Sequence, residues 1–518
     1  MDGSGSGKSA SYSIPNAHQC LGSYVFTDPK GELYDTTAGY LKEQGYDIKV
    51  LNLVRPQYSD GYNPLMHIAS ELDVDVIANT IVKGQKTDSG SDPYWDDMAE
   101  MLLKALIYYL IATRPEEEQN LASCAELVRA ANKNGGSNLL SDLMSQLPYD
   151  HPARMYYKSI EIAPEKTYGS ILSSLQSKLG KFDSKEIAEL TSTDTINFEE
   201  IGSKKTAVYV ISSDTHTAYD FLLTIFFSQM IQQLYDYADQ NGGRLKERTY
   251  FILDEFANIG KIPDFDKKIS TSRSRGISFS VILQNIDQLE AVYEKSYETI
   301  MGNCDTHVFL GSNSFKTVEY FSKQLGEKTI DRDNISINKD KQNHRTGKSL
   351  SDQVMARALM TPDELRRLDN DLCIIFEKGL KPVKAKKFYY FKHPMDKEMQ
   401  RYAISHNDIG EIDRGTWRKY NPYNPYVEED EEEKIENLNI ESLDDLFEDE
   451  DKKGSVPDVK NDTSVNKEDT ETLDSLLNPN VDADAPLLPQ DEDEDTYDLQ
   501  KELEAKFDEL FGPLDDDE

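Results

Sequence analysis

Three glycines followed directly by lysine and serine open this chain, and no other feature constrains its fold more strongly. The first nine residues read Met-Asp-Gly-Ser-Gly-Ser-Gly-Lys-Ser. The Gly-Lys-Ser end matches the phosphate-binding P-loop G-x-x-x-x-G-K-[ST], in which backbone N–H groups and a helix N-terminus surround the phosphates. A P-loop follows the carboxyl end of a buried strand in an open α/β sheet. The motif therefore predicts an α/β fold.

The P-loop interpretation assigns a role to each residue of the stretch. Lys8 is expected to reach the outer phosphates of ATP, and the Ser9 hydroxyl to ligate Mg²⁺. The first glycine of the motif falls on Asp2, so a flexible Gly/Ser leader is the alternative interpretation. The candidate nucleotide-binding residues are Gly3, Gly5, Ser6, Gly7, Lys8 and Ser9.

A P-loop ATPase also needs an acidic residue at the end of a neighbouring apolar strand. Phe251–Leu253 is apolar and runs directly into Asp254 and Glu255. Asp254 is expected to hold Mg²⁺ through water, and Glu255 to orient and deprotonate the attacking water. The next predicted strand, Ser278–Leu283, is followed by Gln284. Because ligands bind beyond the carboxyl ends of parallel strands, Gln284 is expected to face the γ-phosphate.

Two arginines, Arg273 and Arg275, lie between these two predicted strands. An arginine supplied by a neighbouring subunit stabilises charge on a phosphoryl group during transfer. Arg273 is the candidate for this role in trans. A solvated basic loop is the alternative.

The order of strand-like and helical patterns predicts five segments. Short strands, among them Ser23–Thr27 and Thr206–Ile211, alternate with helices near both ends of the body, whereas apolar residues from about 70 to 191 recur at helical spacing. A polar stretch, Asp331–Lys348, is predicted to be a loop. The predicted segments are a nucleotide-binding part in two pieces (1–69 and 192–395), an inserted all-α domain (70–191), a linker (396–427) and an acidic tail (428–518).

Charge is distributed unevenly along the chain. The formal net charge is −38, and residues 428–518 contain 36 acidic and 7 basic residues. A tail of this composition is predicted to be disordered. Because no segment is strongly basic, any nucleic-acid contact must come from local patches. The four cysteines are widely scattered, which argues against a zinc site or a disulfide framework, and no apolar run reaches the length of a membrane span.

Three short segments of the tail share the pattern apolar, Asp, polar, Leu, apolar. They are Leu443–Phe447, Leu473–Leu477 and Phe507–Phe511. Such motifs in an acidic background are predicted to dock a basic accessory factor, or to mimic DNA. An inert solubilising tail is the alternative.

Six short motifs resemble those of TraG/TraD-type coupling proteins of conjugative type IV secretion systems. The resemblance implies a RecA-like domain with an inserted all-α domain, assembled as a ring that is usually hexameric. It also implies an ATP-driven motor that passes single-stranded DNA with its relaxase to the secretion channel, with Arg273 as the arginine finger. The motifs are Gly5–Ser9, Ile14–Asn16, Asp28–Glu32, Tyr62–Leu65, Asp254–Gly260 and Leu283–Gln284.

The chain departs from that family at its N-terminus, where members have transmembrane helices. The resemblance therefore implies work at the cytosolic face of the cell membrane, with the anchor upstream of residue 1. A P-loop without its preceding strand is also expected to be poorly stable or to bind ATP weakly. Two alternatives stay open. One is an FtsK/HerA-like DNA pump not tied to secretion, and the other is a cargo receptor that does not hydrolyse ATP.

Overall fold

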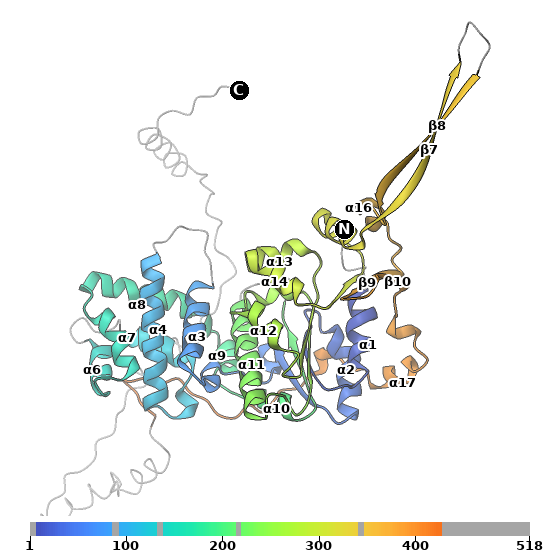
Figure 1. Cartoon of the computed structure of the whole chain (residues 1–518). Coiled ribbons are helices and arrows are strands. Elements are labelled where there is room, and N and C mark those ends of the chain that lie inside the picture. The colour runs from blue at the N-terminus through green and yellow to red at the C-terminus, as the bar shows by residue number, and fades with distance from the viewer. Residues whose placement is uncertain (1–6, 85–92, 132–137, 214–218, 340–345, 427–518) are drawn as a thin grey trace, which may run out of the picture. The chain divides into compact units, whose positions relative to one another are not determined.

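A sheet of five parallel strands lies at the centre of the described chain (Figure 1). The computed structural model describes residues 7–84, 93–131, 138–213, 219–339 and 346–426. Every residue of the first and third strands is buried, as expected of strands that are covered on both faces. In the order β2-β3-β1-β4-β5, the strands are β2 (Asp47–Asn52), β3 (Thr206–Ile211), β1 (Ser23–Thr27), β4 (Thr249–Leu253) and β5 (Ile277–Val281).

Strand β1 contributes side chains to two separate cores, because successive residues of a strand point to opposite faces. Tyr24 packs with α1 (Ile14–Ala17) and α2 (Glu32–Glu43) on one face. Val25 packs on the other face, in the core that contains α11 (Asp220–Gln240). Helices thus cover both faces of a parallel sheet. This confirms the predicted α/β class.

The described residues between β2 and β3 form helices and no strand. Helix α4 packs against α3, α7 and α8, with Leu103, Leu106 and Leu110 fully buried. An all-helical insertion is therefore confirmed, whereas its boundaries at 70 and 191 stay a prediction. The helices are α3 (Glu71–Lys83), α4 (Pro93–Thr113), α5 (Leu121–Ala131), α6 (Leu139–Ser145), α7 (Pro152–Glu161), α8 (Glu165–Leu179) and α9 (Lys185–Leu190), followed by α10 (Phe198–Ser203) just before β3.

The chain enters and leaves the helical insertion at one place. Thr195 and Gly61 exchange two hydrogen bonds of 3.0 Å, one from each backbone N–H. The His67 ring lies 2.9 Å from the Asp194 carboxylate. Entry and exit are thus tied to each other beside the sheet.

A second, smaller sheet follows, with antiparallel strands β6 (Thr306–Phe309), β9 (Leu372–Glu377) and β10 (Val383–Lys386) in the order β10-β9-β6. Its own core joins Phe309 to Val318 and other apolar side chains. The remaining α-helices are α12 (Phe265–Thr271), α13 (Ile286–Tyr293), α14 (Tyr297–Gly302), α15 (Phe315–Leu325), α16 (Pro362–Arg366) and α17 (Asp396–Met399).

Short helical turns connect many of these elements. They are η2 (Ser9–Ser13), η3 (Pro56–Tyr58), η4 (Pro64–His67), η5 (Glu116–Glu118), η6 (Gly180–Asp183), η7 (Phe256–Ile259), η8 (Glu294–Ser296), η9 (Tyr390–Lys392), η10 (Gln400–Tyr402) and η11 (His406–Asp408). None of the described helices is long and apolar enough to span a membrane.

The predicted loop over Asp331–Lys348 is wrong, because most of it belongs to a long hairpin. Strands β7 (Glu327–Lys339) and β8 (Thr346–Ala358) pair in antiparallel register, and the hairpin projects from the rest of the chain (Figure 1). A ladder of this kind satisfies backbone N–H and C=O groups whatever the side chains are. A polar sequence therefore did not indicate a loop.

The segment predicted as a linker lies against the body, and we call its residues 403–420 the C-terminal strap. Ile404 donates a backbone hydrogen bond of 3.1 Å to the Asp35 carbonyl at the start of α2. Further along, Arg414 donates to the Pro56 carbonyl over 3.0 Å. Tyr420 donates its N–H to Ser123 Oγ over 2.9 Å, in α5 of the helical insertion. The predicted tail and its three motifs lie outside the described residues.

Candidate functional site

The described end of the P-loop begins at Gly7, whose φ is +70°. This left-handed conformation favours glycine because it carries no Cβ. The Gly7 carbonyl then accepts hydrogen bonds from the backbone N–H and the hydroxyl of Ser11, at 2.8 and 2.7 Å. The chain thereby turns from the loop into η2 and α1. Of the other candidate residues, Gly3, Gly5 and Ser6 lie outside the described residues.

The Asp254 carboxylate at the end of β4 lies against both P-loop side chains. Lys8 Nζ is 3.6 Å from Asp254 Oδ1, and Ser9 Oγ is 3.4 Å from Oδ2. The side chains of Lys8 and Asp254 are only 12% and 13% exposed. Burial raises the pKa of Asp254, and the neighbouring Lys8 charge works in the opposite direction. The structure therefore brings together the lysine, the hydroxyl and the acid that the sequence predicted.

Glu255 presents its carboxylate beside this cluster and accepts a hydrogen bond at each oxygen. Gln284 Nε2 donates to Oε1 over 3.0 Å, and Asn258 Nδ2 donates to Oε2 over 3.1 Å. The backbone of Glu255 is left-handed, with a φ of +51°. A non-glycine residue in this region is strained, and such residues cluster at functional sites. Gln284, three residues beyond the end of β5, is thus adjacent to Glu255, whereas its contact with a γ-phosphate stays a prediction.

Arg273 lies elsewhere. It precedes β5, whereas Gln284 follows that strand, so the two residues occupy opposite ends of it. The Arg273 side chain is 93% exposed, with Nη1 3.5 Å from an Asp305 carboxylate oxygen. Its neighbour Arg275 is held by two 3.0 Å hydrogen bonds to Asp239. Within one subunit, Arg273 is therefore available at the surface but does not take part in the site.

Asp28 belongs to the motif Asp28–Glu32, and the sequence did not predict its role. It is 2% exposed, and its Oδ2 accepts the Tyr34 N–H over 2.8 Å in the first turn of α2. Burial raises its pKa to about 6, although backbone hydrogen bonds from Tyr34 and Leu33 oppose the shift. The carboxylate thus caps α2. An aspartate a few residues ahead of a helical pattern is a capping signal that could have suggested this.

The donor set of the site fits a magnesium ion bound together with nucleotide phosphates. Ser9 offers a hydroxyl and Asp254 a carboxylate, and these two groups lie 3.4 Å apart. Mg²⁺ is usually held by one or two protein oxygen ligands plus phosphates and water, rather than by a cage of protein ligands. No cluster of three or more His, Cys, Asp or Glu side chains suited to a metal occurs in the described parts of the chain.

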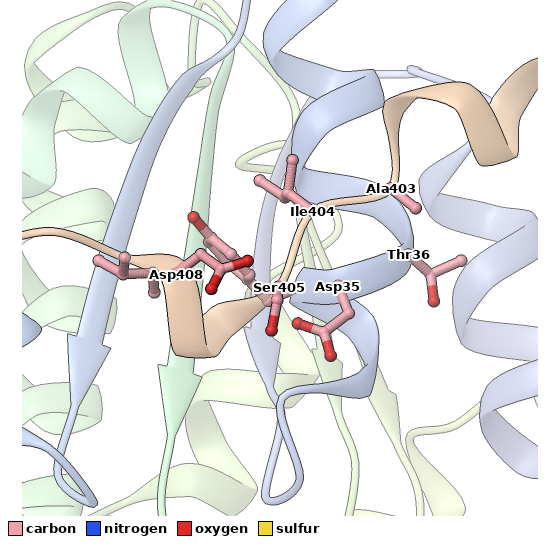
Figure 2. Close-up of a pocket in the computed structure, with 8 residues that line it drawn as sticks. Asp35, Thr36, Ala403, Ile404, Ser405 and Asp408 are labelled. Atoms are coloured by element: carbon pink, nitrogen blue, oxygen red, sulfur yellow. The ribbon is translucent and has the colours of Figure 1, made fainter.

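A separate pocket of about 670 Å³ lies between the start of α2 and the C-terminal strap (Figure 2). Asp35 and Thr36 line it from α2, and Ile404, Ser405 and Asp408 line it from the strap. None of its lining residues is a candidate catalytic or phosphate-binding residue. We therefore place the functional site at the ends of β4 and β5 and not in this pocket.

Fold and site together define a P-loop nucleotide-binding protein. Residues 1–410 match the family described as type IV secretory system conjugative DNA transfer. This chain belongs to that family.

Individual relatives are distant in sequence. A conjugal transfer protein TraG of Escherichia coli is 25% identical over 427 residues, which cover 75% of this chain and 66% of the relative. A protein VirD4 of Agrobacterium fabrum (strain C58 / ATCC 33970) is 24% identical over 410 residues, covering 75% and 58%. The chain thus spans less than two thirds of the length of these relatives. A solved structure of the plasmid coupling protein TrwB, in complex with a non-hydrolysable ATP analogue, has a TM-score of 0.49 at 16% identity. That match covers 77% of this chain and 89% of TrwB.

Proposed function

We propose that this chain is the ATP-driven motor of a conjugative coupling protein. It recruits single-stranded DNA with its relaxase and drives the strand into a type IV secretion channel. It works as a homo-oligomeric ring, a hexamer, at the cytosolic face of the cell membrane. The observation that carries the proposal is the cluster of Lys8, Ser9, Asp254, Glu255 and Gln284 within a member of the conjugative DNA transfer family.

Binding of ATP begins with an exchange of partners at Lys8. In the structure the Lys8 ammonium faces Asp254 over 3.6 Å. Phosphate oxygens arriving at the P-loop offer Lys8 a stronger, charge-assisted contact. Asp254 is then left to complete the magnesium site with Ser9. A magnesium ion held by Ser9 and Asp254 would supply positive charge that offsets the negative charge of the phosphates.

Hydrolysis then depends on Glu255. Its carboxylate orients the attacking water and takes up the proton at Oε1 or Oε2. Asn258 and Gln284 fix the direction of this carboxylate, because each donates to one of its oxygens. When ATP binds, Gln284 releases its hydrogen bond to Glu255 and donates to a γ-phosphate oxygen instead. This change of partner would couple ATP binding to the position of β5 and of the elements that follow it.

Arg273 completes the site from a neighbouring subunit. It is nearly fully exposed and lies at the other end of β5, so only a second copy can bring it to a bound phosphate. If Arg273 acts on the site of a neighbouring subunit, hydrolysis depends on assembly of the ring. An isolated subunit lacks the arginine that stabilises negative charge on the transferring phosphoryl group.

The first experiment measures ATP hydrolysis by the full chain with and without single-stranded DNA. We expect hydrolysis to rise with DNA, and to fall about 100-fold or more in Glu255→Gln because the general base is lost. Lys8→Ala is expected to lose ATP binding itself. Lys42→Ala, at the exposed end of α2, is the matched lysine control and should behave as wild type. A chain that binds ATP but never hydrolyses it would refute the motor and favour a cargo receptor.

A mixing experiment tests Arg273 in trans. Arg273→Ala alone is expected to reduce hydrolysis about 1,000-fold. Mixing it with Glu255→Gln should restore part of the activity, because an intact Arg273 of one variant then faces an intact Glu255 of the other. No recovery at any mixing ratio would show that Arg273 is not the finger.

A further inference from the structure

An aromatic segment distant in sequence lies directly against the P-loop. The turn η9 contacts η2, and the ring of Tyr389 lies so close to Gly7 that a Cβ there would be 3.0 Å from Tyr389 Cε1. Gly7 is the residue before the phosphate-binding Lys8. The Tyr389 ring therefore lies next to the loop that would hold the phosphates of a bound nucleotide.

Tyr389 is half of a stacked pair. Its ring and that of Phe391 lie 5.2 Å apart with an interplanar angle of 23°. Phe391 is 50% exposed, and Lys392 Nζ lies 4.6 Å from the centre of the Tyr389 ring. We call Tyr389 and Phe391 the aromatic shelf. The pair combines an exposed aromatic ring, that of Phe391, with the positive charge of Lys392 close to the P-loop.

The shelf is anchored from two sides, so it does not have to be ordered by a ligand. The Tyr389 hydroxyl donates to the Asn370 carbonyl over 3.2 Å. The intervening Tyr390 packs into the core formed by α1, α2 and the sheet. A surface that is already ordered binds at a lower entropic cost.

The site residues beside the P-loop supply charge and not an aromatic surface. Lys8, Asp254 and Glu255 are all charged, and they face one another or Gln284. A nucleotide whose phosphates lie at Gly7 to Ser9 must place its base within its own length of that loop. Aromatic rings bind bases by stacking on their π-faces.

The geometry points to the aromatic shelf as the surface on which the base of the bound nucleoside triphosphate stacks. This inference rests on the proposed ATP site and adds its base-binding part. Stacking uses the face of the base and not its hydrogen-bonding edge. Adenine and guanine nucleotides are therefore expected to bind with similar affinity, and purines more tightly than pyrimidines.

The test compares binding of Mg-ATP with binding of inorganic tripolyphosphate, which has the charge but no base. In the full chain, Phe391→Ala and Tyr389→Ala are expected to weaken ATP binding about tenfold. Tripolyphosphate binding should stay within twofold of wild type. Phe388→Ala is the matched control, because Phe388 is 54% exposed and faces His393 instead of the P-loop.

Two conservative variants protect the test against misfolding. Tyr389→Phe keeps the ring but loses the hydroxyl anchor to Asn370, so its ATP affinity should lie between those of wild type and Tyr389→Ala. Phe391→Leu keeps bulk without a π-face and should bind ATP as weakly as Phe391→Ala. Unchanged ATP affinity in Phe391→Leu and in both alanine variants would overturn the inference. The inference would also be overturned if these variants lost binding of single-stranded DNA but kept ATP binding, because the shelf would then be a DNA-binding surface. A wild-type chain that binds neither ATP nor tripolyphosphate would instead overturn the proposed function and the shelf with it.

Discussion

Strands β1 and β4 pair along their whole length, from Ser23 opposite Thr249 to Thr27 opposite Leu253, and each is followed by an aspartate. Asp28 turns to the helix that follows its strand and caps α2. Asp254 turns to the P-loop and faces Lys8 and Ser9. The two acids thus occupy equivalent places on one edge of the sheet. Asp28 stabilises a helix end, whereas Asp254 belongs to the candidate functional site.

The difference arises from what each carboxylate meets. The groups that shift the pKa of Asp28 include no cation, only backbone N–H groups and the like charges of Asp35 and Glu32. Asp254 has a lysine within ion-pair distance. An acid that receives only backbone N–H groups stabilises a helix end, whereas an acid beside a lysine and a hydroxyl can share a cation with phosphates. Four predictions test this contrast, from the largest effect to the smallest.

The largest difference is expected when each aspartate is replaced by asparagine. Asp254→Asn should reduce ATP hydrolysis about 100-fold, because a neutral amide is a poor partner for the magnesium shell. Asp28→Asn should leave the rate at neutral pH within a few-fold of wild type, since the amide oxygen still accepts the Tyr34 N–H. Equal losses of rate in the two variants would remove the distinction between them.

A second prediction concerns the pH dependence of stability. The folded state of the wild type releases the Asp28 proton near pH 6, while the unfolded chain releases it near the ordinary value of 3.8. Between these values the folded state binds more protons, so its stability falls as the pH rises. The amide in Asp28→Asn cannot titrate. The stability of wild type minus that of Asp28→Asn should therefore fall by about 2 kcal/mol from pH 4 to pH 7, measured by urea unfolding. A constant difference would contradict the pKa shift.

The third prediction separates capping from charge at Asp28. Asp28→Ala leaves the buried N–H of Tyr34 without its acceptor, whereas Asp28→Asn keeps one. At neutral pH the alanine variant should therefore be about 2 kcal/mol less stable than the asparagine variant. Urea unfolding of both variants measures this, and amide exchange at Tyr34 should be faster in the alanine variant. Equal stabilities would show that the cap contributes little.

The smallest effect is expected at the contact that joins the two strand ends. Thr27 Oγ1 donates to the Asp254 carbonyl over 2.7 Å. Thr27→Val should lower stability by about 1 kcal/mol and also raise the KM for ATP, since Asp254 loses a support. Thr37→Val is the control, because its hydroxyl bonds to Leu33 and Tyr209 away from the site. If both variants have the same KM, the Thr27 contact is structural only.

The sequence predicted the central strands well because each is a short apolar run between turns. The ranges of β1 and β3 match their predictions residue for residue. Strand direction alone also predicted that one edge of the sheet carries Lys8, Asp254 and Gln284. The reason is that the carboxyl ends of parallel strands lie at the same edge. What could not be predicted is which way each polar side chain turns there. The bond from Gln284 to Glu255 and the separate role of Asp28 both depend on backbone angles that a motif does not contain.

Other features were missed because they join parts of the chain that are far apart. The contact of Tyr389 with Gly7 links the two ends of the nucleotide-binding part, and no local pattern indicates it. The hairpin of β7 and β8 was missed because its ladder depends on backbone pairing and not on apolar alternation. The pairing of β6 and β9 in a separate antiparallel sheet was not predicted either, because it joins residues more than 60 positions apart.

The C-terminal strap has a mechanical consequence for the helical insertion. The chain enters and leaves the insertion where Gly61 and Thr195 exchange hydrogen bonds, and α3 of the insertion packs against α11 in a core shared with the sheet. The strap adds a further attachment, because Tyr420 is bonded to Ser123 in α5 while Ile404 is bonded to Asp35 in α2. Any rotation of the insertion relative to α2 must therefore stretch or release the strap as well as disturb the shared core.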